Sequence, residues 1–434
     1  MKILFIWPKI HSPIYKEFDM EKSLLYKIGP KLIPFTKSLT FPILAALTPE
    51  KHDVELIEGD NHSIDFTKKY DIVGITVTTA SANLSYKIAD EFRKNGSFVA
   101  LGGYHPTALP NEAKQHADAV FIGESEDTWP QLLRDMEHKK PKEIYELEHP
   151  VHPNSIPIQR QINGKNTGLV IQATRGCPNR CEFCSISNMK FRHLFRKRPI
   201  ETVVKEIKLF QNKSFAFYDD SLTIDPNYTK ELFSSIKDLN KNFVSYGNIN
   251  VLGKDEELLK IASEAGCTSW MIGFESVSPQ SLKSAGKKTN KVEVYCKHVK
   301  KIHEYGMSII GFFVFGFDYD TIDVFDKTTD LIEKCEIDAP LPFILTPLPG
   351  TPLYDRFERE GRILTKDWDK YNLGNVVFQP KNMTPEELLN NSINAHREWY
   401  KISNNVKRIL KNLKYSLRLS LYTTANNFYT KFPR

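Results

Sequence analysis

The stretch RGCPNRCEFCSI, residues 175–186, places three cysteines four and three positions apart: Cys177, Cys181 and Cys184. A [4Fe–4S] cluster is normally held by four cysteine thiolates. Three thiolates in one loop, with no fourth cysteine beside them, therefore predict a cluster in which one iron is open to another ligand. That open iron is where chemistry can take place.

A structural zinc site is the alternative for these cysteines, in a non-catalytic or redox-sensing protein. Zinc prefers a closed tetrahedron, usually built from two separated pairs of ligands. His193 could supply a fourth ligand, but no second cysteine pair follows. The remaining cysteines stand alone in segments that read as helix or strand, where we expect buried free thiols: Cys267, Cys296 and Cys335.

The bulk composition favours a cytoplasmic enzyme of two or three domains. The chain has 434 residues, of which 41% are hydrophobic and 26% charged, with a net charge of +6. The start, MKILFIWPKI, is too short for a signal peptide, and no apolar run has the length of a membrane span. Few cysteines indicate a reducing compartment.

Residues 1–140 alternate β-branched strands with helical segments, which predicts a doubly wound, flavodoxin-like (Rossmann-type) sheet. The five expected strands begin at Ile3, Val54, Ile72, Phe98 and Ala119. Ligands of such sheets bind beyond the carboxyl ends of the strands. The candidate cofactor contacts at these ends are Thr76, Thr78, Gly102, Gly103, His105, Gly123 and Glu124.

Residues 141–166 are rich in proline and polar residues and read as a linker. Residues 167–352 then form a second βα series, whose six strands predict a partial (βα)6 TIM barrel. Its strands begin at Thr167, Ser214, Phe243, Thr268, Ser308 and Leu341. Reactive groups of barrels gather at the carboxyl ends, where the candidates are Asp219, Asp220, Asn248, Gly273, Glu275 and Ser276. Phe312, Phe313, Phe315 and Phe317 are expected to be core and lining.

The CxxxCxxC spacing, with Phe183 just before the last cysteine, resembles the signature of the radical S-adenosylmethionine (SAM) superfamily. The resemblance implies that the open iron binds SAM and that reductive cleavage, with a flavodoxin or ferredoxin as reductant, yields a 5′-deoxyadenosyl radical. It implies SAM contacts for Phe183, for Asp219 and Asp220, which end strand two without the family's GGE sequence, and for Asn248. In IGFESVSPQ it points to Gly273, Ser276 and above all Glu275. Carboxylates that bind loop amides are the structural alternative for Asp219 and Glu275.

LGGYHPTALP from Leu101 and IGESE from Ile122 resemble the cobalamin-binding domain that precedes many radical SAM enzymes. The chain lacks the DxHxxG motif that supplies a histidine to cobalt; the nearest string, GDNHSIDF, contains His62. The resemblance therefore implies base-off cobalamin without that histidine. A domain that keeps the fold but binds no cofactor is the alternative.

The C-terminal region, residues 353–434, is expected to be mainly helical. Its DWDKYNLGNVVFQPKNM string resembles enzymes of the hopanoid C-2 methylase and tetraether ring synthase group, which act on lipids. The resemblance implies a cobalamin-dependent C-methyltransferase acting at an unactivated carbon of a small molecule, with an isoprenoid or other lipid as one candidate. A ring-forming or carbon–carbon bond-forming radical enzyme is the alternative. A tRNA methylthiotransferase is disfavoured, because no cysteine precedes Cys177.

The tail carries a basic amphipathic pattern, which predicts peripheral contact with a membrane surface. A helix whose apolar stripe packs on the barrel is the alternative, and no nucleic-acid module accompanies the charge. The apolar positions are Ile402, Val406, Ile409, Leu410, Leu413, Leu417 and Leu421, and the basic ones Lys401, Lys407, Arg408, Lys411, Lys414 and Arg418.

Overall fold

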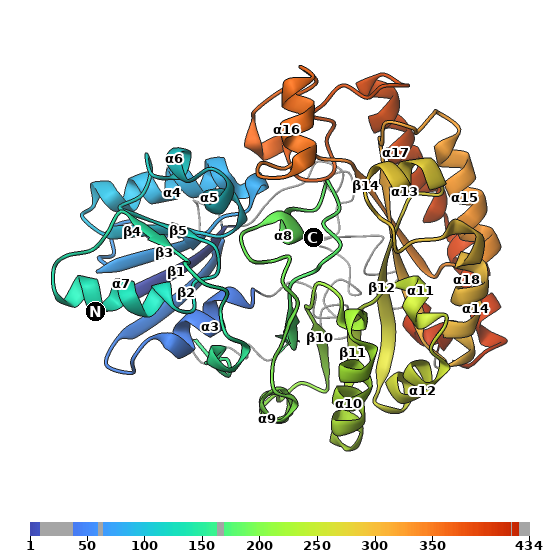
Figure 1. Ribbon diagram of the computed structural model, residues 1–434, viewed down its shortest axis with the longest axis horizontal. Helices are drawn as coiled ribbons and strands as arrows, with labels where there is room; N and C mark the ends of the chain where they lie inside the picture. Colours follow the sequence, from blue (N-terminus) through green and yellow to red (C-terminus); the bar gives the residue numbers. More distant parts are fainter. Residues whose placement is uncertain (9–37, 60–63, 163–168, 418, 425–434) are drawn as a thin grey trace.

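The computed structural model describes residues 1–8, 38–59, 64–162, 169–417 and 419–424, so that His62 lies outside the described part (Figure 1). The first domain has six parallel strands in the order β2-β1-β3-β4-β5-β6. They are β1 (Lys2–Pro8), β2 (Asp53–Gly59), β3 (Ile72–Thr76), β4 (Phe98–Gly102), β5 (Ala119–Ile122) and β6 (Ile144–Glu146). The order confirms the doubly wound fold. β6 lies in the segment predicted to be a linker, so the sheet continues past residue 140.

Alternating side chains of β1 show how this sheet is covered. Ile3 and Phe5 pack on one face, against α3 and α7, whereas Leu4 and Ile6 pack on the other, against α4. Figure 1 shows α4, α5 and α6 together on one side of the sheet. The helices are α3 (Thr40–Leu47), α4 (Ala82–Lys94), α5 (Tyr104–Ala108), α6 (Pro110–Ala113) and α7 (Thr128–Glu137).

The second domain is a curved sheet of six parallel strands in the order β14-β13-β12-β11-β10-β7, which confirms the partial barrel. The strands are β7 (Val170–Ile171), β10 (Ser214–Phe217), β11 (Asn242–Tyr246), β12 (Cys267–Glu275), β13 (Ser308–Phe315) and β14 (Ala339–Ile344). The helices between them are α9 (Ile200–Lys208), α10 (Pro226–Ile236), α11 (Ile249–Leu252), α12 (Glu256–Glu264), α13 (Pro279–Ser284), α14 (Tyr295–Glu304) and α15 (Val324–Cys335).

The phenylalanines of β13 divide between the two faces of the barrel sheet. Phe313 and Phe315 pack outward into the main core, beneath the helices. Phe312 points inward and joins an apolar group with Ile310 and Met271. The strand therefore supplies both core and lining, as expected from its period of two.

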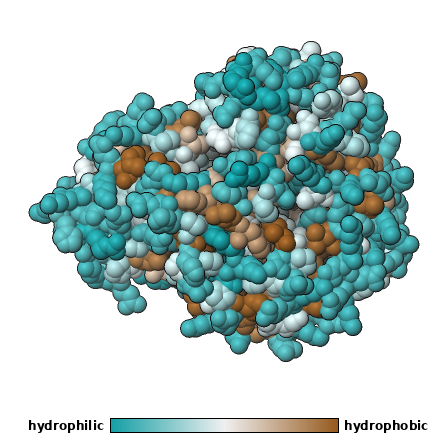
Figure 2. All heavy atoms as spheres, in the orientation of Figure 1, coloured by the Kyte–Doolittle hydropathy of each residue, from teal (hydrophilic) through white to brown (hydrophobic). Residues whose placement is uncertain are grey.

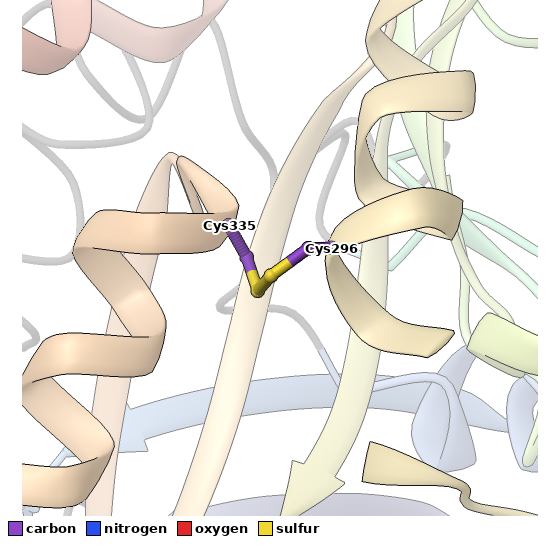
Figure 3. Close-up of a disulfide and its surroundings, with 2 residues drawn as sticks. All are labelled: Cys296 and Cys335. Atoms are coloured by element: carbon purple, nitrogen blue, oxygen red, sulfur yellow. A yellow bond between two sulfur atoms is a disulfide. The ribbon is translucent and has the colours of Figure 1, made fainter. Parts of the chain in front are cut away.

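Cys296 and Cys335 form a disulfide bond, with Cα atoms 4.2 Å apart (Figure 3). The expectation that both are free thiols is therefore wrong. They lie 39 positions apart in the sequence but on α14 and α15, which are consecutive helices packed on neighbouring strands. Cys267 is a buried thiol, as expected, with Sγ 3.7 Å from Ser269 O.

The C-terminal region is mainly helical, as predicted, and packs on both domains. Trp368 and Tyr371 join the core of the first domain, whereas Leu388 and Trp399 join that of the second. No helix of the described residues is both long and apolar enough to cross a membrane. The helices are α16 (Pro352–Arg359), α17 (Pro385–Trp399) and α18 (Ile402–Leu413).

Candidate active site

A cavity of 570 Å³ lies between the two domains, at the carboxyl ends of their strands. Its walls come from the loops after β3 and β4, from the cluster loop, from the turn after β14 and from the C-terminal region. The residues that border the cavity include Thr78, Tyr104, Asn188, Met189 and Gly350. Figure 2 shows apolar residues grouped between the two domains on the face in view.

A buried ion-pair network joins the two domains beside this cavity. The Glu124 carboxylate, after β5, accepts hydrogen bonds from both terminal nitrogens of Arg196 at 2.7 Å and from Arg192 Nη1 at 3.1 Å. Arg192 Nη2 also donates to both oxygens of Asp220, after β10, at 3.0 Å. Burial alone would raise the pKa of Glu124, but the arginines hold it at about 2. Glu124, a predicted cofactor contact, thus binds arginines of the other domain.

The cluster loop is held by its backbone. It leaves the short ribbon of β8 (Thr174–Arg175) and β9 (Arg196–Lys197) and ends in α8 (Ser185–Asn188). Cys177 N donates to Arg192 O at 2.8 Å. Asn188 Nδ2 donates to Cys181 O at 2.9 Å and to Cys184 O at 2.8 Å. The loop is therefore shaped by groups other than the thiols.

The three thiols lie close enough together to influence one another's titration, as the ligands of one cluster would. Burial raises the pKa of Cys177 and, to about 12, that of Cys181, and a metal that binds such a thiol removes its proton outright. No group of His, Cys, Asp or Glu side chains among the described residues is arranged to hold a single ion. Thiolates of a cubane need not converge on one point, because each binds its own iron.

Asp219 and Asp220 both support the cluster loop. The Asp219 carboxylate accepts hydrogen bonds from Ala173 N at 3.0 Å, from Thr174 Oγ1 at 2.7 Å and from Thr174 N. Burial raises its pKa to about 7, although these hydrogen bonds act in the opposite direction. Asp220 Oδ2 accepts from Gly176 N, the residue before Cys177, at 2.7 Å. These contacts match the structural alternative for Asp219.

Asp219→Asn tests that role. An amide has one accepting oxygen where the carboxylate has two, so its NH₂ would face a backbone N–H that now donates to the carboxylate. We expect the variant to lose about 1–3 kcal/mol of unfolding free energy, the cost of unsatisfied buried polar groups. Urea denaturation followed by tryptophan fluorescence measures it, with the exposed Asp238→Asn as control. Unchanged stability combined with lost SAM binding would instead favour a direct SAM contact.

Glu275 lies at a break in β12, with a left-handed backbone at φ +65°. Its Oε1 accepts from Lys287 Nζ at 2.7 Å. Burial alone would lower the pKa of Lys287, but Glu275 and the thiols of the cluster loop raise it. A Cβ at Gly273 would overlap Glu275 Oε1, so the glycine makes room for the carboxylate. The buried Ser276 Oγ accepts from Ser278 N at 3.0 Å.

Asn248 and Gly273 are brought together by Asn290. Asn290 Nδ2 donates to Gly273 O at 2.8 Å, and its Oδ1 lies 3.4 Å from Asn248 Nδ2. Asn248 Oδ1 also caps α11 by accepting from Asn250 N at 2.9 Å. Phe183 packs edge-on against Phe317, with ring centroids 5.7 Å apart.

On the first domain, Thr76, Gly102 and Gly103 border a narrow pocket of 40 Å³ beside α3 and α7, whereas Thr78 borders the larger cavity. Gly103 has φ +108°, and a Cβ there would meet Val77 O at 2.7 Å. Glycine is therefore required at 103 because the protein's own backbone fills the space of a side chain. Cobalamin contacts at Thr76, Gly102 and Gly103 stay a prediction.

His105 does not face either pocket. It is fully buried, with Nε2 3.1 Å from Glu112 Oε1 and Nδ1 3.4 Å from Thr79 Oγ1. Both ring nitrogens have protein partners, which matches a structural role, and a cofactor contact of His105 stays a prediction. Gly123 N donates to Thr107 Oγ1 at 3.1 Å, so it shapes the loop after β5.

Sequence reasoning missed four residues of this region: Asn188, Arg192, Lys287 and Tyr104. Arg192 and Lys287 are buried charges that face acids distant in the sequence, so no local spacing marks them. Tyr104 stands in the GGYHPT string next to His105, the residue predicted to contact the cofactor.

Comparisons with known proteins agree with this geometry. Residues 171–332 match the model of the radical SAM superfamily, residues 36–133 that of the B12 binding domain, and residues 351–427 a domain of unknown function (DUF4070). They confirm the expected order of a cobalamin-binding domain followed by a radical SAM core.

Among curated proteins, the chain is 34% identical over 388 residues to bacteriochlorophyllide d C-12(1)-methyltransferase of Chlorobaculum tepidum, covering 86% of this chain and 84% of that protein. It is 31% identical to the C-8(2)-methyltransferase of the same organism, with 79% and 81% covered. Hopanoid C-2 methylase of Rhodopseudomonas palustris is 26% identical, with 62% and 54% covered. A solved structure of TsrM from Kitasatospora setae, a radical SAM methyltransferase with cobalamin and a [4Fe–4S] cluster bound, shares the fold: TM-score 0.65, 15% identity, 83% and 75% covered.

Proposed function

Because this chain belongs to the cobalamin-dependent radical SAM methyltransferase family, we propose that it methylates an unactivated carbon of a large, mainly apolar molecule. Its cofactors are a [4Fe–4S] cluster, SAM and cobalamin, the last proposed to be base-off. The observation that carries the proposal is a cavity bordered both by the strand ends of the first domain and by the cluster loop.

When bound, cobalamin supplies the methyl group, and the cluster with SAM supplies a radical that abstracts hydrogen from carbon. The chain's own residues hold these groups in place and exclude water. Asn188 and Arg192 fix the backbone on either side of the cysteines. The Glu275–Lys287 pair places a carboxylate and an ammonium group beside the cluster loop. These charges are complementary to the ammonium and carboxylate groups of SAM.

Aromatic side chains on the inner face of the barrel support an apolar substrate. Phe312 lies 5.8 Å from Phe343 and 6.1 Å from Tyr246, centroid to centroid, and all three are half-buried. The relatives are named for a bacteriochlorophyllide and a hopanoid, which are large ring compounds. We propose a substrate of that kind, a lipid among the candidates, reached by peripheral contact with a membrane.

The experiment uses SAM with a deuterated methyl group, a flavodoxin or ferredoxin reductant and candidate ring compounds and isoprenoid lipids. The proposal expects a trideuteromethylated product together with 5′-deoxyadenosine, detected by mass spectrometry. Substrate-dependent 5′-deoxyadenosine with an unmethylated, rearranged or cyclised product would replace methyl transfer by ring-forming chemistry. Such chemistry is named for a relative that is 26% identical, the magnesium-protoporphyrin IX monomethyl ester cyclase of Cereibacter sphaeroides.

A further inference from the structure

The C-terminal helical segment, residues 402–424, is attached to the barrel through its polar side. Asp338, just before β14, is fully buried and accepts hydrogen bonds from Asn412 Nδ2 at 2.5 Å and from Thr423 Oγ1 at 2.8 Å. The same carboxylate accepts from Ile309 N at 2.7 Å and lies 2.8 Å from His303 Nε2. The segment is thus fastened by a buried polar cluster.

The opposite side of the segment is an exposed apolar stripe. In α18 its members recur at intervals of four, four and three residues, which is the spacing of one helical face. Leu417 and Leu421 belong to the helical turns after residue 416, which fold back on α18 through a hydrogen bond from Ser420 Oγ to Ile409 O at 3.0 Å. The exposed fractions in the stripe are Ile402 75%, Val406 46%, Leu410 59%, Leu413 46%, Leu417 67% and Leu421 61%. A surface helix ordinarily buries such a stripe. The alternative in which these residues pack on the barrel is therefore wrong, because Asn412 and Thr423 take the inward positions.

Basic residues flank the stripe. Residues 401–424 contain six lysines and arginines and no aspartate or glutamate. Neighbouring acids offset part of this charge: Glu336 pairs with Lys414 at 2.7 Å and with Lys411 at 3.8 Å, and Glu398 pairs with Lys401. Lys407 is exposed beside Val406. Figure 1 shows α18 on the side of the barrel remote from the first domain, away from the entrance between the domains.

We propose that this stripe docks the protein on an anionic lipid surface, with the leucines among the head groups and the lysines against the negative charge. Apolar side chains bordered by lysines are the pattern of an interfacial helix. A second copy of the chain fits less well, since pairing two stripes would bring like charges together. The inference gives the proposed membrane contact a surface and stands independently of the reaction.

Cosedimentation of the full-length holoenzyme with vesicles tests it, using phosphatidylcholine alone and phosphatidylcholine mixed with phosphatidylglycerol. We expect binding to the anionic vesicles to exceed that to neutral ones by at least about tenfold and to weaken in high salt. The double variant L410E/L417E should bind at least about tenfold less. Leu209→Glu, at a leucine 61% exposed directly after α9, is the matched control and should bind as the wild type does.

Equal binding of the double variant, or no binding of the wild type, would overturn the proposal. A wild-type dimer without lipid that L410E/L417E dissociates would assign the stripe to a second copy instead. SAM cleavage measured in the same preparations reports on the active site separately, and the double variant should keep it because its substitutions are exposed and remote from the cavity.

Discussion

Alanine at Cys177, Cys181 or Cys184 is expected to abolish 5′-deoxyadenosine formation. Each thiolate binds a different iron of the cluster, so the loss of one cannot be shared by the others. Within the described residues, the remaining thiol, Cys267, is buried at the start of β12, at the opposite end of the strand from Glu275. Cys267 therefore cannot replace a missing cluster ligand.

The measurement combines iron and sulfide analysis of the reconstituted variants with an assay of deoxyadenosine under reducing conditions. We expect iron content to fall well below that of the wild type while cobalamin is still bound, because the first domain has its own core. Cys267→Ala is the matched control and should keep both cluster and activity. A cluster-loop variant that still cleaves SAM would refute the assignment.

Glu124→Gln is expected to lower methyl transfer more strongly than SAM cleavage. Three arginines face Glu124: Arg175 at 3.7 Å, Arg192 at 3.1 Å and Arg196 at 2.7 Å. A neutral amide at this position removes the carboxylate from all three, although Arg175 keeps Glu126 and Arg192 keeps Asp220 as partners. Breaking a buried ion pair by removing one partner costs about 3–5 kcal/mol. This network fixes the position of one domain relative to the other. We therefore expect the rate of methyl transfer to fall more than the rate of SAM cleavage.

The pH dependence of stability gives an independent readout. The pKa of Glu124 is held at about 2 in the folded protein, against 4.5 for the unperturbed group. Between these two pH values the Glu124 carboxyl is protonated in the unfolded chain and ionised in the folded one. The ionised Glu124 therefore stabilises the fold by about 3 kcal/mol above pH 4.5, and this stabilisation is lost as pH falls towards 2. Denaturation midpoints across this range should fall less steeply for Glu124→Gln than for the wild type.

Glu148→Gln, at an exposed glutamate shortly after β6, is the control for both measurements. It should leave stability, its pH dependence and the ratio of methylated product to deoxyadenosine unchanged. A Glu124→Gln variant with wild-type stability and an unaltered product ratio would contradict the role of the network.

Local patterns predicted the parts of this molecule that depend on local sequence. The cysteine spacing marked the cluster loop, and alternating β-branched segments predicted both parallel sheets. The role of Glu124 could not be predicted in this way, and for Asp219 the sequence left a SAM contact and a structural role both open. Glu124 stands at a strand end that suits a cofactor, but its partners lie about 50 to 70 residues further along the chain.

Two further features depended on tertiary packing. Cys296 and Cys335 meet only because α14 and α15 pack side by side. The amphipathic pattern after residue 401 was visible in the sequence, but which side faces the barrel was not. The orientation depends on the buried Asp338, which binds Asn412 of α18 and Thr423 of the helical turn that folds back after it.

We propose that a [4Fe–4S] cluster and a cobalamin open on one cavity. Electron paramagnetic resonance of the wild-type protein, reconstituted with iron, sulfide and cobalamin and then reduced, tests it most directly. We expect the two signals in equal amounts, a change of the cluster signal on addition of SAM, and broadening of each centre's signal by the other centre. A cluster without retained cobalamin, or zinc in place of iron, would contradict it.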